Sequence, residues 1–225
     1  MASRPRQLAL ALDHAESYAR DDFLSGSGNA AALTLIESWP DWPANAVALI
    51  GPEGSGKSHL ASVWAEVSGA RMTSGRALRQ NDLLSELATS ALVVEDAAAA
   101  DERALFHLIN LAREEESFLL FTARTAPTLW PVAIADLASR LRALPVVSLQ
   151  APDDAMLRGV LMKLAADRQL ELDESVVRYL LSHIERSFAA ARAAVVALDN
   201  EALRQGRPVT RALAAELFRG DGEEA

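Results

Sequence analysis

The chain has 225 residues, of which 50% are hydrophobic, and it carries a formal net charge of −9. This size fits one large domain or two small ones, while the acidic balance argues against direct binding to the phosphate backbone of nucleic acid, so any link to DNA is expected to be indirect. The sequence has no cysteine and no apolar stretch long enough for a signal peptide or a membrane span, which excludes disulfides and a cysteine nucleophile and predicts a cytoplasmic protein.

Residues 1–20 are the least regular part of the chain, and we expect a flexible tail with a short apolar stretch at residues 7–12. From residue 29 to residue 39 the apolar side chains recur at helical spacing, and the prolines that follow end the pattern because proline cannot extend a helix. Residues 47–50 form a short apolar run that stops at Gly51, which predicts a buried strand of a parallel sheet.

A phosphate-binding motif follows this strand directly. Residues 51–58 read Gly-Pro-Glu-Gly-Ser-Gly-Lys-Ser, which matches the P-loop pattern G-x-x-x-x-G-K-[ST], and residues 58–68 continue as an amphipathic helix. Glycines let backbone N–H groups converge on phosphates, and the N-terminus of the helix adds partial positive charge. In such a loop Lys57 reaches the β- and γ-phosphate oxygens and Ser58 binds Mg²⁺. The strand and helix on either side favour a nucleotide site over a chance glycine-rich turn.

Strand and helix signals alternate after the P-loop. The predicted strands at residues 91–95, 118–122 and 146–149 are separated by helical patterns at residues 82–88 and 101–115. Such alternation is typical of a parallel sheet with helices on both faces, whose ligands bind at the carboxyl edge of the strands. The pattern therefore predicts an α/β domain with the P-loop at that edge.

The strand signal disappears after Pro152. Four helices are predicted from there, at residues 153–167, 174–183, 188–206 and 210–218. Asp153, Asp173 and Thr210 are the expected N-caps, and Gly206 is the expected stop of the third of these helices. The chain is thus predicted to end in a small all-helical domain.

Two carboxylates end the apolar strand at residues 91–95 in the manner of a Walker B motif, in which one acid holds Mg²⁺ and its neighbour orients the attacking water. If Asp96 holds the metal, Ala97 follows it and no base is adjacent. If Glu95 holds the metal, Asp96 is a base on a shorter arm. Nucleotide binding is compatible with either arrangement, whereas fast hydrolysis is not favoured, and a merely solvated acidic strand end is the other interpretation.

Three further side chains are candidates for contact with phosphate. Thr122 ends a predicted strand, where its hydroxyl is expected either to face the γ-phosphate side of the cleft or to stabilise a turn. Arg140 and Arg192 carry guanidinium groups, which are planar, always charged and suited to phosphate. Arginine on an amphipathic helix is more often a solvated surface residue, so the pattern alone leaves both roles open.

Together these segments resemble the DnaA-type AAA+ proteins, and among them the Hda group of replication-initiation regulators. The resemblance covers roughly residues 20–218 and rests on Asp22-Phe23-Leu24 with Gly26 and Asn29, residues 51–58, residues 92–96, Thr122-Ala123-Arg124, Ser139-Arg140-Leu141 and residues 192–199. It implies a P-loop AAA+ parallel αβα sandwich of five strands followed by a helical lid. We therefore expect an AAA+ nucleotide-binding domain at residues 21–151, a lid domain at residues 152–219 and a tail at residues 220–225.

Two features are similar to the Hda group rather than to DnaA itself. The sequence stops after the lid, so the carboxyl-terminal DNA-binding domain of the initiator is not expected. The tail carries Gln7, Leu8, Leu10 and Leu12, which resemble the short peptide by which Hda docks on the DNA polymerase sliding clamp. An extended peptide of this kind places a glutamine and alternate leucines in a hydrophobic groove, although a nondescript apolar tail has the same composition.

The resemblance also implies roles for individual residues. Phe23 and Asn29 would lie near the adenine, Arg192 would be the lid sensor, and Arg140 would be an arginine finger offered in trans to the initiator's ATP. Ser58 and Glu95 would hold Mg²⁺ together with the nucleotide, which is ADP or ATP. The implied nucleotide-binding set is Phe23, Asn29, Gly51, Pro52, Glu53, Gly54, Ser55, Gly56, Lys57, Ser58, His59 and Arg192.

The implied function is inactivation of the initiator DnaA: with the DNA-loaded sliding clamp, the protein would stimulate hydrolysis of the ATP bound to DnaA and so restrain replication initiation. The chain departs from the DnaA pattern at Glu95 and Ala123, where DnaA proteins usually or often have Asp, and we expect weak or no ATPase activity of its own. A homo-oligomer is compatible with the sequence.

Two other functions remain open at the level of sequence. A free-standing ATPase or motor would need a base beside the metal ligand, which the order Glu95-Asp96-Ala97 disfavours. A helicase loader or replication scaffold would be expected to show a basic groove or an added DNA-binding segment, and the acidic balance predicts neither.

Overall fold

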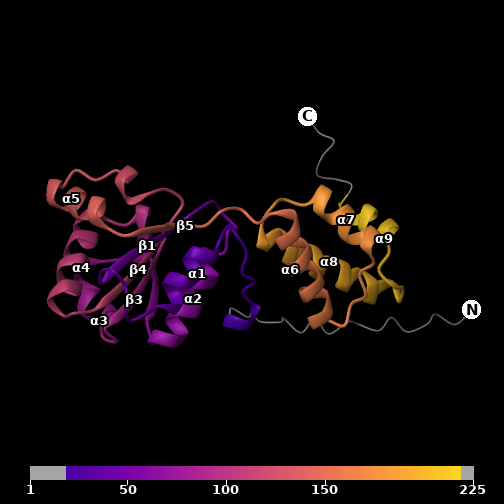
Figure 1. Ribbon diagram of the computed structural model, residues 1–225, viewed down its shortest axis with the longest axis horizontal. Coiled ribbons are helices and arrows are strands. Elements are labelled where there is room, and N and C mark those ends of the chain that lie inside the picture. The colour runs from indigo at the N-terminus through magenta and orange to yellow at the C-terminus, as the bar shows by residue number, and fades with distance from the viewer. Residues whose placement is uncertain (1–18, 219–225) are drawn as a thin grey trace, which may run out of the picture. The chain divides into compact units, whose positions relative to one another are not determined.

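The computed structural model describes residues 19–218, which divide into two units between Pro152 and Asp153. The first unit is an α/β domain and the second consists of helices (Figure 1). Gln7, Leu8, Leu10 and Leu12, which carry the predicted clamp-binding peptide, lie outside the described residues, as does the predicted tail at residues 220–225.

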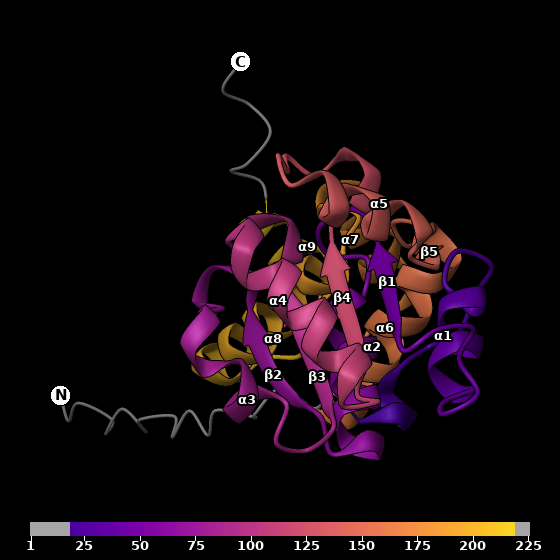
Figure 2. The same cartoon turned by 90° about the vertical axis from the view of Figure 1, so that its left-hand side faces the viewer.

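The α/β unit is built on a parallel sheet. Its strands are β1 (Ala46–Ile50), β2 (Arg71–Ser74), β3 (Ala91–Glu95), β4 (Phe118–Ala123) and β5 (Val146–Ser148). Within the described residues they lie in the order β2-β3-β4-β1-β5, and every neighbouring pair is parallel (Figure 2). The carboxyl ends of β1, β3 and β4 therefore meet at one edge, because parallel strands all end on the same side of a sheet.

Alternate residues of the central strands face two separate cores, as expected for strands buried on both faces. On one face Val47, Leu49 and Val93 pack with α1 (Ala30–Glu37) and α2 (Lys57–Ser68). On the other face Leu92 and Phe121 pack with three more helices, α3 (Leu83–Glu86), α4 (Glu102–Glu114) and α5 (Ala135–Ala143). Short 3₁₀ turns occur at Arg20–Asp22, Gly75–Ala77, Gln80–Asp82, Ala97–Ala99 and Pro127–Leu129. The unit is thus a three-layer αβα sandwich.

β2 is the strand that the apolar pattern does not predict. It lies at the edge of the sheet, and three of its four residues are exposed. An edge strand with little buried surface carries no apolar run, so the sequence offers no signal for it. The strands and helices that the sequence does predict are present, with ends that differ by a few residues.

The second unit contains α6 (Asp154–Asp167), α7 (Glu174–His183), α8 (Phe188–Gln205) and α9 (Arg211–Phe218). The predicted N-caps are confirmed, since the backbone N–H of Met156 donates to Asp153 at 2.8 Å, that of Val176 donates to Asp173 at 2.9 Å and that of Leu213 donates to Thr210 at 3.3 Å. Gly206 ends α8 with a φ of +61°, where a side chain would be strained.

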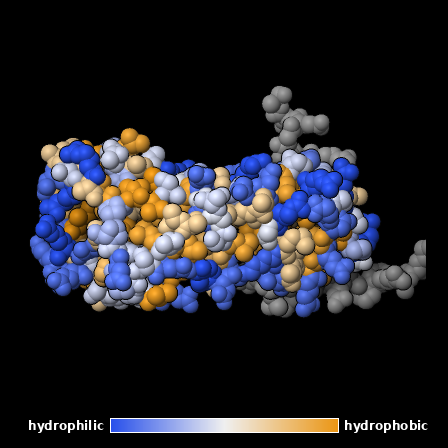
Figure 3. Space-filling view, in the orientation of Figure 1, coloured by the Kyte–Doolittle hydropathy of each residue, from blue (hydrophilic) through white to orange (hydrophobic). Residues whose placement is uncertain are grey.

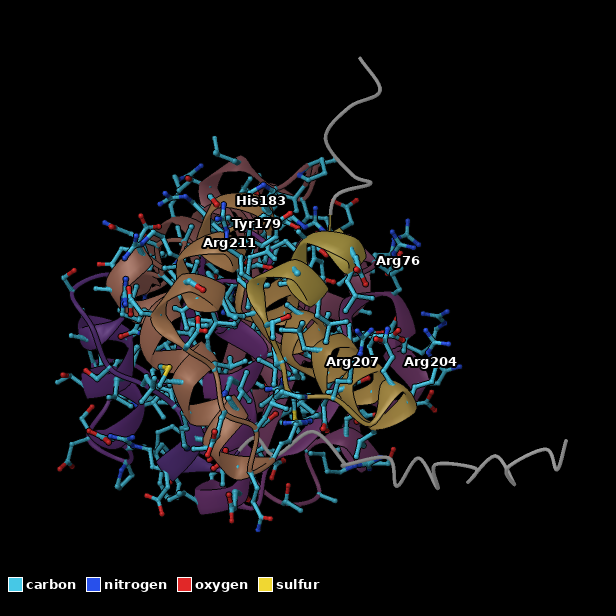
Figure 4. All side chains as sticks on the ribbon, turned by 90° about the vertical axis from the view of Figure 1, so that its right-hand side faces the viewer. Arg76, Tyr179, His183, Arg204, Arg207 and Arg211 are labelled. Carbon is cyan, nitrogen blue, oxygen red and sulfur yellow. The ribbon has the colours of Figure 1, made fainter. Side chains whose placement is uncertain are left out.

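One end of the helical unit carries an aromatic stack. The rings of Tyr179 and His183 lie 3.8 Å apart between centroids, and the guanidinium of Arg211 lies 6.0 Å from the Tyr179 centroid (Figure 4). The contact of Arg211 with Tyr179 joins α9 to α7 beside a core rich in leucine, valine and alanine. The stack therefore contributes to the packing of this unit.

Hydrophobic and hydrophilic side chains are interspersed over the surface that Figure 3 shows. Individual apolar side chains such as Leu84 and Leu129 are exposed, which is normal for a folded domain. Among residues 19–218 no helix combines the length and the apolar character needed to cross a membrane.

Candidate nucleotide site

The P-loop leaves the carboxyl end of β1 and opens α2. A Cβ added to Gly51 would lie 2.4 Å from the carbonyl oxygen of Leu149, so no larger residue fits there without a shift of the backbone. Gly56 has a φ of +95° and directly precedes Lys57, the first residue of α2. This conformation turns the loop into the helix, whose first N–H groups are then free to point at an anion. The backbone thus has the form of a phosphate cradle.

Lys57 lies within this loop. Its ammonium group donates to the carbonyl oxygens of Gly51 at 2.8 Å and Pro52 at 2.7 Å. Burial lowers the pKa of Lys57 from its ordinary value, while the negative charge of Asp96 acts in the opposite direction and raises it. The two carbonyl contacts and Asp96 favour the charged form, which is the form that attracts phosphate.

The Walker B carboxylates follow β3 at the same edge of the sheet. Glu95 is half-buried and Asp96 is exposed, with a φ of +49°, a conformation that Asp tolerates better than most residues. The backbone N–H of Asp96 donates to the hydroxyl of Thr122 at 3.2 Å, and Thr122 itself is only 2% exposed. The structure therefore gives Thr122 a definite contact, which is support for the turn that presents Asp96.

Asp96 and Glu95 differ in their effect on the P-loop lysine. Of the charged neighbours that alter the pKa of Lys57, Asp96 has the largest influence and Glu95 the smallest. Of the two acids, Asp96 therefore has the stronger electrostatic effect on the lysine of the cradle. The hydroxyl of Ser58 is exposed in the first turn of α2. Hydroxyl and carboxylate oxygens are the ligands that Mg²⁺ prefers, so the residue types fit this ion.

An ion pair crosses the same edge and was not among the predicted site features. The guanidinium of Arg124, the residue after β4, lies 2.6 Å from a carboxylate oxygen of Glu53 in the P-loop. Both side chains are exposed. Arg124 belongs to the segment Thr122-Ala123-Arg124, but its distance of 71 positions from Glu53 leaves no local signal for the pair.

The segment before α1 is held against the beginning of α2. The ring of Phe23 meets the ring of His59 edge-on at 5.2 Å, and His59 also contacts the carbonyl oxygen of Ala19 through Nε2 at 3.0 Å. Asn29 is buried, and its side chain accepts from the N–H of Gly26 at 2.8 Å and donates to the carbonyl of Leu24 at 3.0 Å. The structure thus brings Phe23 and His59 together, while the amide of Asn29 stabilises the turn that leads from Phe23 to α1.

The two arginines singled out from the sequence lie in different units. Arg140, on α5, contacts the carboxylate of Asp136 at 3.2 Å and lies over the ring of Phe106, 5.6 Å from its centroid. Its side chain is 28% exposed, so the guanidinium is at the surface. Arg192 is half-buried on α8 of the helical unit. Their roles as finger and sensor stay predictions.

Comparison with known proteins agrees with this geometry. Residues 153–216 match the family described as "Hda, lid domain". The chain is similar in structure to domain III of the Thermotoga maritima replication initiation protein DnaA, with a TM-score of 0.75 and 18% identity over 92% of this chain and 98% of that one. DnaA from Aquifex aeolicus bound to AMPPCP gives a TM-score of 0.66 at 18% identity, covering 84% of this chain and 67% of that one.

The Thermotoga maritima RuvB Holliday junction branch migration motor is also similar, with a TM-score of 0.73 and 18% identity over 90% of this chain and 72% of that one. At these identities the similarity establishes the fold. The predicted fold class, a P-loop AAA+ sandwich followed by a helical lid, is therefore confirmed. The match of residues 153–216 to the Hda lid agrees with the predicted relation to the Hda group of DnaA-type proteins.

Proposed function

We propose that this DnaA-related AAA+ protein, whose lid is of the Hda type, is a nucleotide-binding regulator that inactivates the replication initiator DnaA. It would do so by stimulating hydrolysis of the ATP bound to DnaA, together with the DNA-loaded sliding clamp. The observation that carries the proposal is the Hda lid match at residues 153–216, which follows an α/β unit with a well-formed phosphate cradle.

The cradle fits a nucleoside diphosphate or triphosphate. Gly51 leaves no room for a larger side chain, Gly56 adopts a left-handed conformation, and Lys57 supplies a buried positive charge. The structure of the Aquifex aeolicus relative contains AMPPCP, a triphosphate analogue, which supports the same ligand class here. The P-loop backbone and Lys57 would hold the phosphates, and Ser58 with a Walker B carboxylate would hold Mg²⁺, whose positive charge offsets that of the phosphates. Phe23 and His59 would cover the base, and Arg192 would serve as the lid sensor.

Weak hydrolysis by the chain itself follows from the Walker B turn. Asp96 has a stronger electrostatic effect on Lys57 than Glu95 has, and its backbone is held by Thr122, so we assign to Asp96 the role nearer the phosphates. The next residue is Ala97, which is buried and has no proton acceptor. With no carboxylate following Asp96, nothing at that position orients an attacking water.

Arg140 would act on the ATP of the partner rather than on nucleotide bound to this chain. Near the surface an i,i+4 ion pair is worth about 0.3–0.5 kcal/mol and a cation–π contact about 0.5–1 kcal/mol, so the half-buried Arg140 loses little when it gives up Asp136 and Phe106. Arginine fingers raise phosphoryl-transfer rates by about 10³ to 10⁵. A guanidinium inserted beside the γ-phosphate of DnaA would stabilise the charge that develops there.

Contact with the sliding clamp is assigned to Gln7, Leu8, Leu10 and Leu12. A glutamine followed by alternate leucines suits a hydrophobic groove on a partner protein. DNA would be reached only through the clamp and the initiator, in line with the net charge of −9.

The test is the rate at which DnaA–ATP hydrolyses its nucleotide, with DNA-loaded clamp, in the presence and absence of this protein. We expect a large acceleration that is lost in Arg140→Ala and in Gln7→Ala combined with Leu8→Ala. Arg142→Ala is the matched control, since it removes the same charge from an exposed position of the same helix. No acceleration by a protein that binds nucleotide normally would overturn the proposal in favour of a helicase loader or scaffold.

A further inference from the structure

Arg124 leaves the sheet directly beside the P-loop. In the strand order β4 lies between β3, which carries the Walker B acids, and β1, which leads into the P-loop. The last residue of β4, Ala123, pairs with Ile50, and its carbonyl oxygen accepts from the N–H of Gly51 at 3.2 Å. The arrows of β1 and β4 accordingly end side by side in Figure 2. The next residue, Arg124, is thus placed at the mouth of the phosphate cradle.

The partner of Arg124 is part of the cradle itself. Glu53 follows Pro52 in the P-loop, and its carboxylate oxygen lies 2.6 Å from the guanidinium of Arg124. The side chains are 67% and 75% exposed, so water screens the pair and it contributes little to stability. A phosphate group accepts from the same planar fork of donors as a carboxylate does. The pair is therefore well suited to exchange one anion for another.

Both charges are also felt by Lys57. The positive charge of Arg124 lowers the pKa of Lys57 and the negative charge of Glu53 raises it, although burial has the larger effect. Both groups hence act electrostatically on the ammonium that reaches the β- and γ-phosphates in P-loop proteins. A γ-phosphate beside Lys57 would bring negative charge near Glu53, which disfavours the carboxylate and favours its cationic partner.

We propose that Arg124 is a second cation of the nucleotide site that binds the γ-phosphate, and that Glu53 competes with this phosphate for the Arg124 guanidinium. This inference rests on the proposed binding of nucleotide to the P-loop. With a diphosphate, Arg124 stays on Glu53; with a triphosphate, it transfers to the γ-phosphate. Arg124 and Glu53 thus decide how strongly the chain distinguishes ATP from ADP, and they couple the P-loop to the segment that follows β4.

The experiment compares the dissociation constants of ADP and AMPPCP, each with Mg²⁺, for the isolated full-length protein. AMPPCP is used because it retains the γ-phosphate and is not hydrolysed. Arg124→Ala is expected to weaken AMPPCP by roughly 10- to 100-fold, the loss typical of one charge-assisted contact, and to leave ADP within about twofold. Glu53→Gln keeps the shape of its side chain but removes the competing charge, so AMPPCP is expected to bind more tightly and ADP unchanged.

Arg113→Ala is the control for net charge. Arg113 lies in the last turn of α4, which leads into the amino end of β4, so it is at the edge of the sheet opposite the cradle. This variant is expected to bind both nucleotides as the wild type does. Arg124→Lys, which retains the charge without the fork, is expected to recover part of the AMPPCP affinity.

Equal weakening of ADP and AMPPCP in Arg124→Ala, or no change in either, would overturn the inference. The ratio of the two dissociation constants is independent of any effect on DnaA. If the ratio shifts as expected while the wild type fails to stimulate DnaA, the inference holds and the proposed function fails. If the wild type stimulates DnaA and the ratio does not shift in the variants, the proposed function holds and the inference about Arg124 fails.

Discussion

Gly51→Ala tests whether the cradle depends on the close approach of two strands. The new Cβ would lie 2.4 Å from the carbonyl oxygen of Leu149, and Leu149 is held in place because its N–H donates to Ile50 at 2.7 Å. Overpacking of this kind costs about 1–3 kcal/mol, and a φ of +156°, rarely adopted by L side chains, adds about 1–3 kcal/mol. We expect Tm to fall by roughly 5 to 20 °C, on a scale of about 2–4 °C per kcal/mol.

Nucleotide affinity is the second readout of Gly51→Ala. Relief of the clash must move the first residue of the P-loop, so contacts between backbone N–H groups and phosphate are lost and affinity falls by at least roughly tenfold. Gly69→Ala is the matched control, because Gly69 also has a positive φ, +70°, but a Cβ there meets nothing within 4 Å. It is expected to lower Tm by roughly 2–5 °C and to bind nucleotide normally. Wild-type affinity in Gly51→Ala would refute the reasoning.

Three further outcomes are expected from single changes. Lys57→Ala should lose both nucleotide binding and stimulation of DnaA, whereas Arg140→Ala should lose stimulation alone; equal loss of binding in the two variants contradicts the trans finger. Thr122→Val removes the acceptor of the Asp96 N–H and should lower the free energy of unfolding by about 1–2 kcal/mol in urea titrations, an effect absent if water replaces the hydroxyl. Hydrogen bonds from Ser175 and Val176 lower the pKa of Asp173 below its ordinary 3.8. The stabilisation that ionised Asp173 gives to the lid is therefore fully present above pH 3.8 and is lost as the pH falls through the lowered pKa. Asp173→Asn should flatten this acid dependence in circular dichroism.

The structural features that the sequence predicts are those formed by residues close together in the chain. The P-loop is a continuous motif, and its strand and helix follow from the apolar pattern on either side of it. The N-caps at Asp153 and Asp173 and the stop at Gly206 are equally local, because each acts on backbone groups within a few residues. The Walker B strand is predicted for the same reason, as an apolar run that ends in two acids.

Features that depend on the order of strands in the sheet are not predicted from local pattern. β2 has no apolar run because it lies at an exposed edge, and its position follows only from its pairing with β3. The contact of Thr122 with Asp96 requires β3 and β4 to be neighbours, and a lone threonine at a strand end does not indicate which backbone group it meets.

The pair of Arg124 and Glu53 shows how strand order creates a functional contact. Nothing in the residues around Arg124 distinguishes it from other exposed arginines, and its partner is 71 positions away. The pairing of Ile50 with Ala123 places the residues that follow β1 and β4 side by side, and only then does the guanidinium reach the P-loop. If β4 were separated from β1 by another strand, about 4.8 Å further away, the same two residues would lie out of contact. The proposed discrimination between ATP and ADP is therefore a property of the topology, expressed through two exposed side chains.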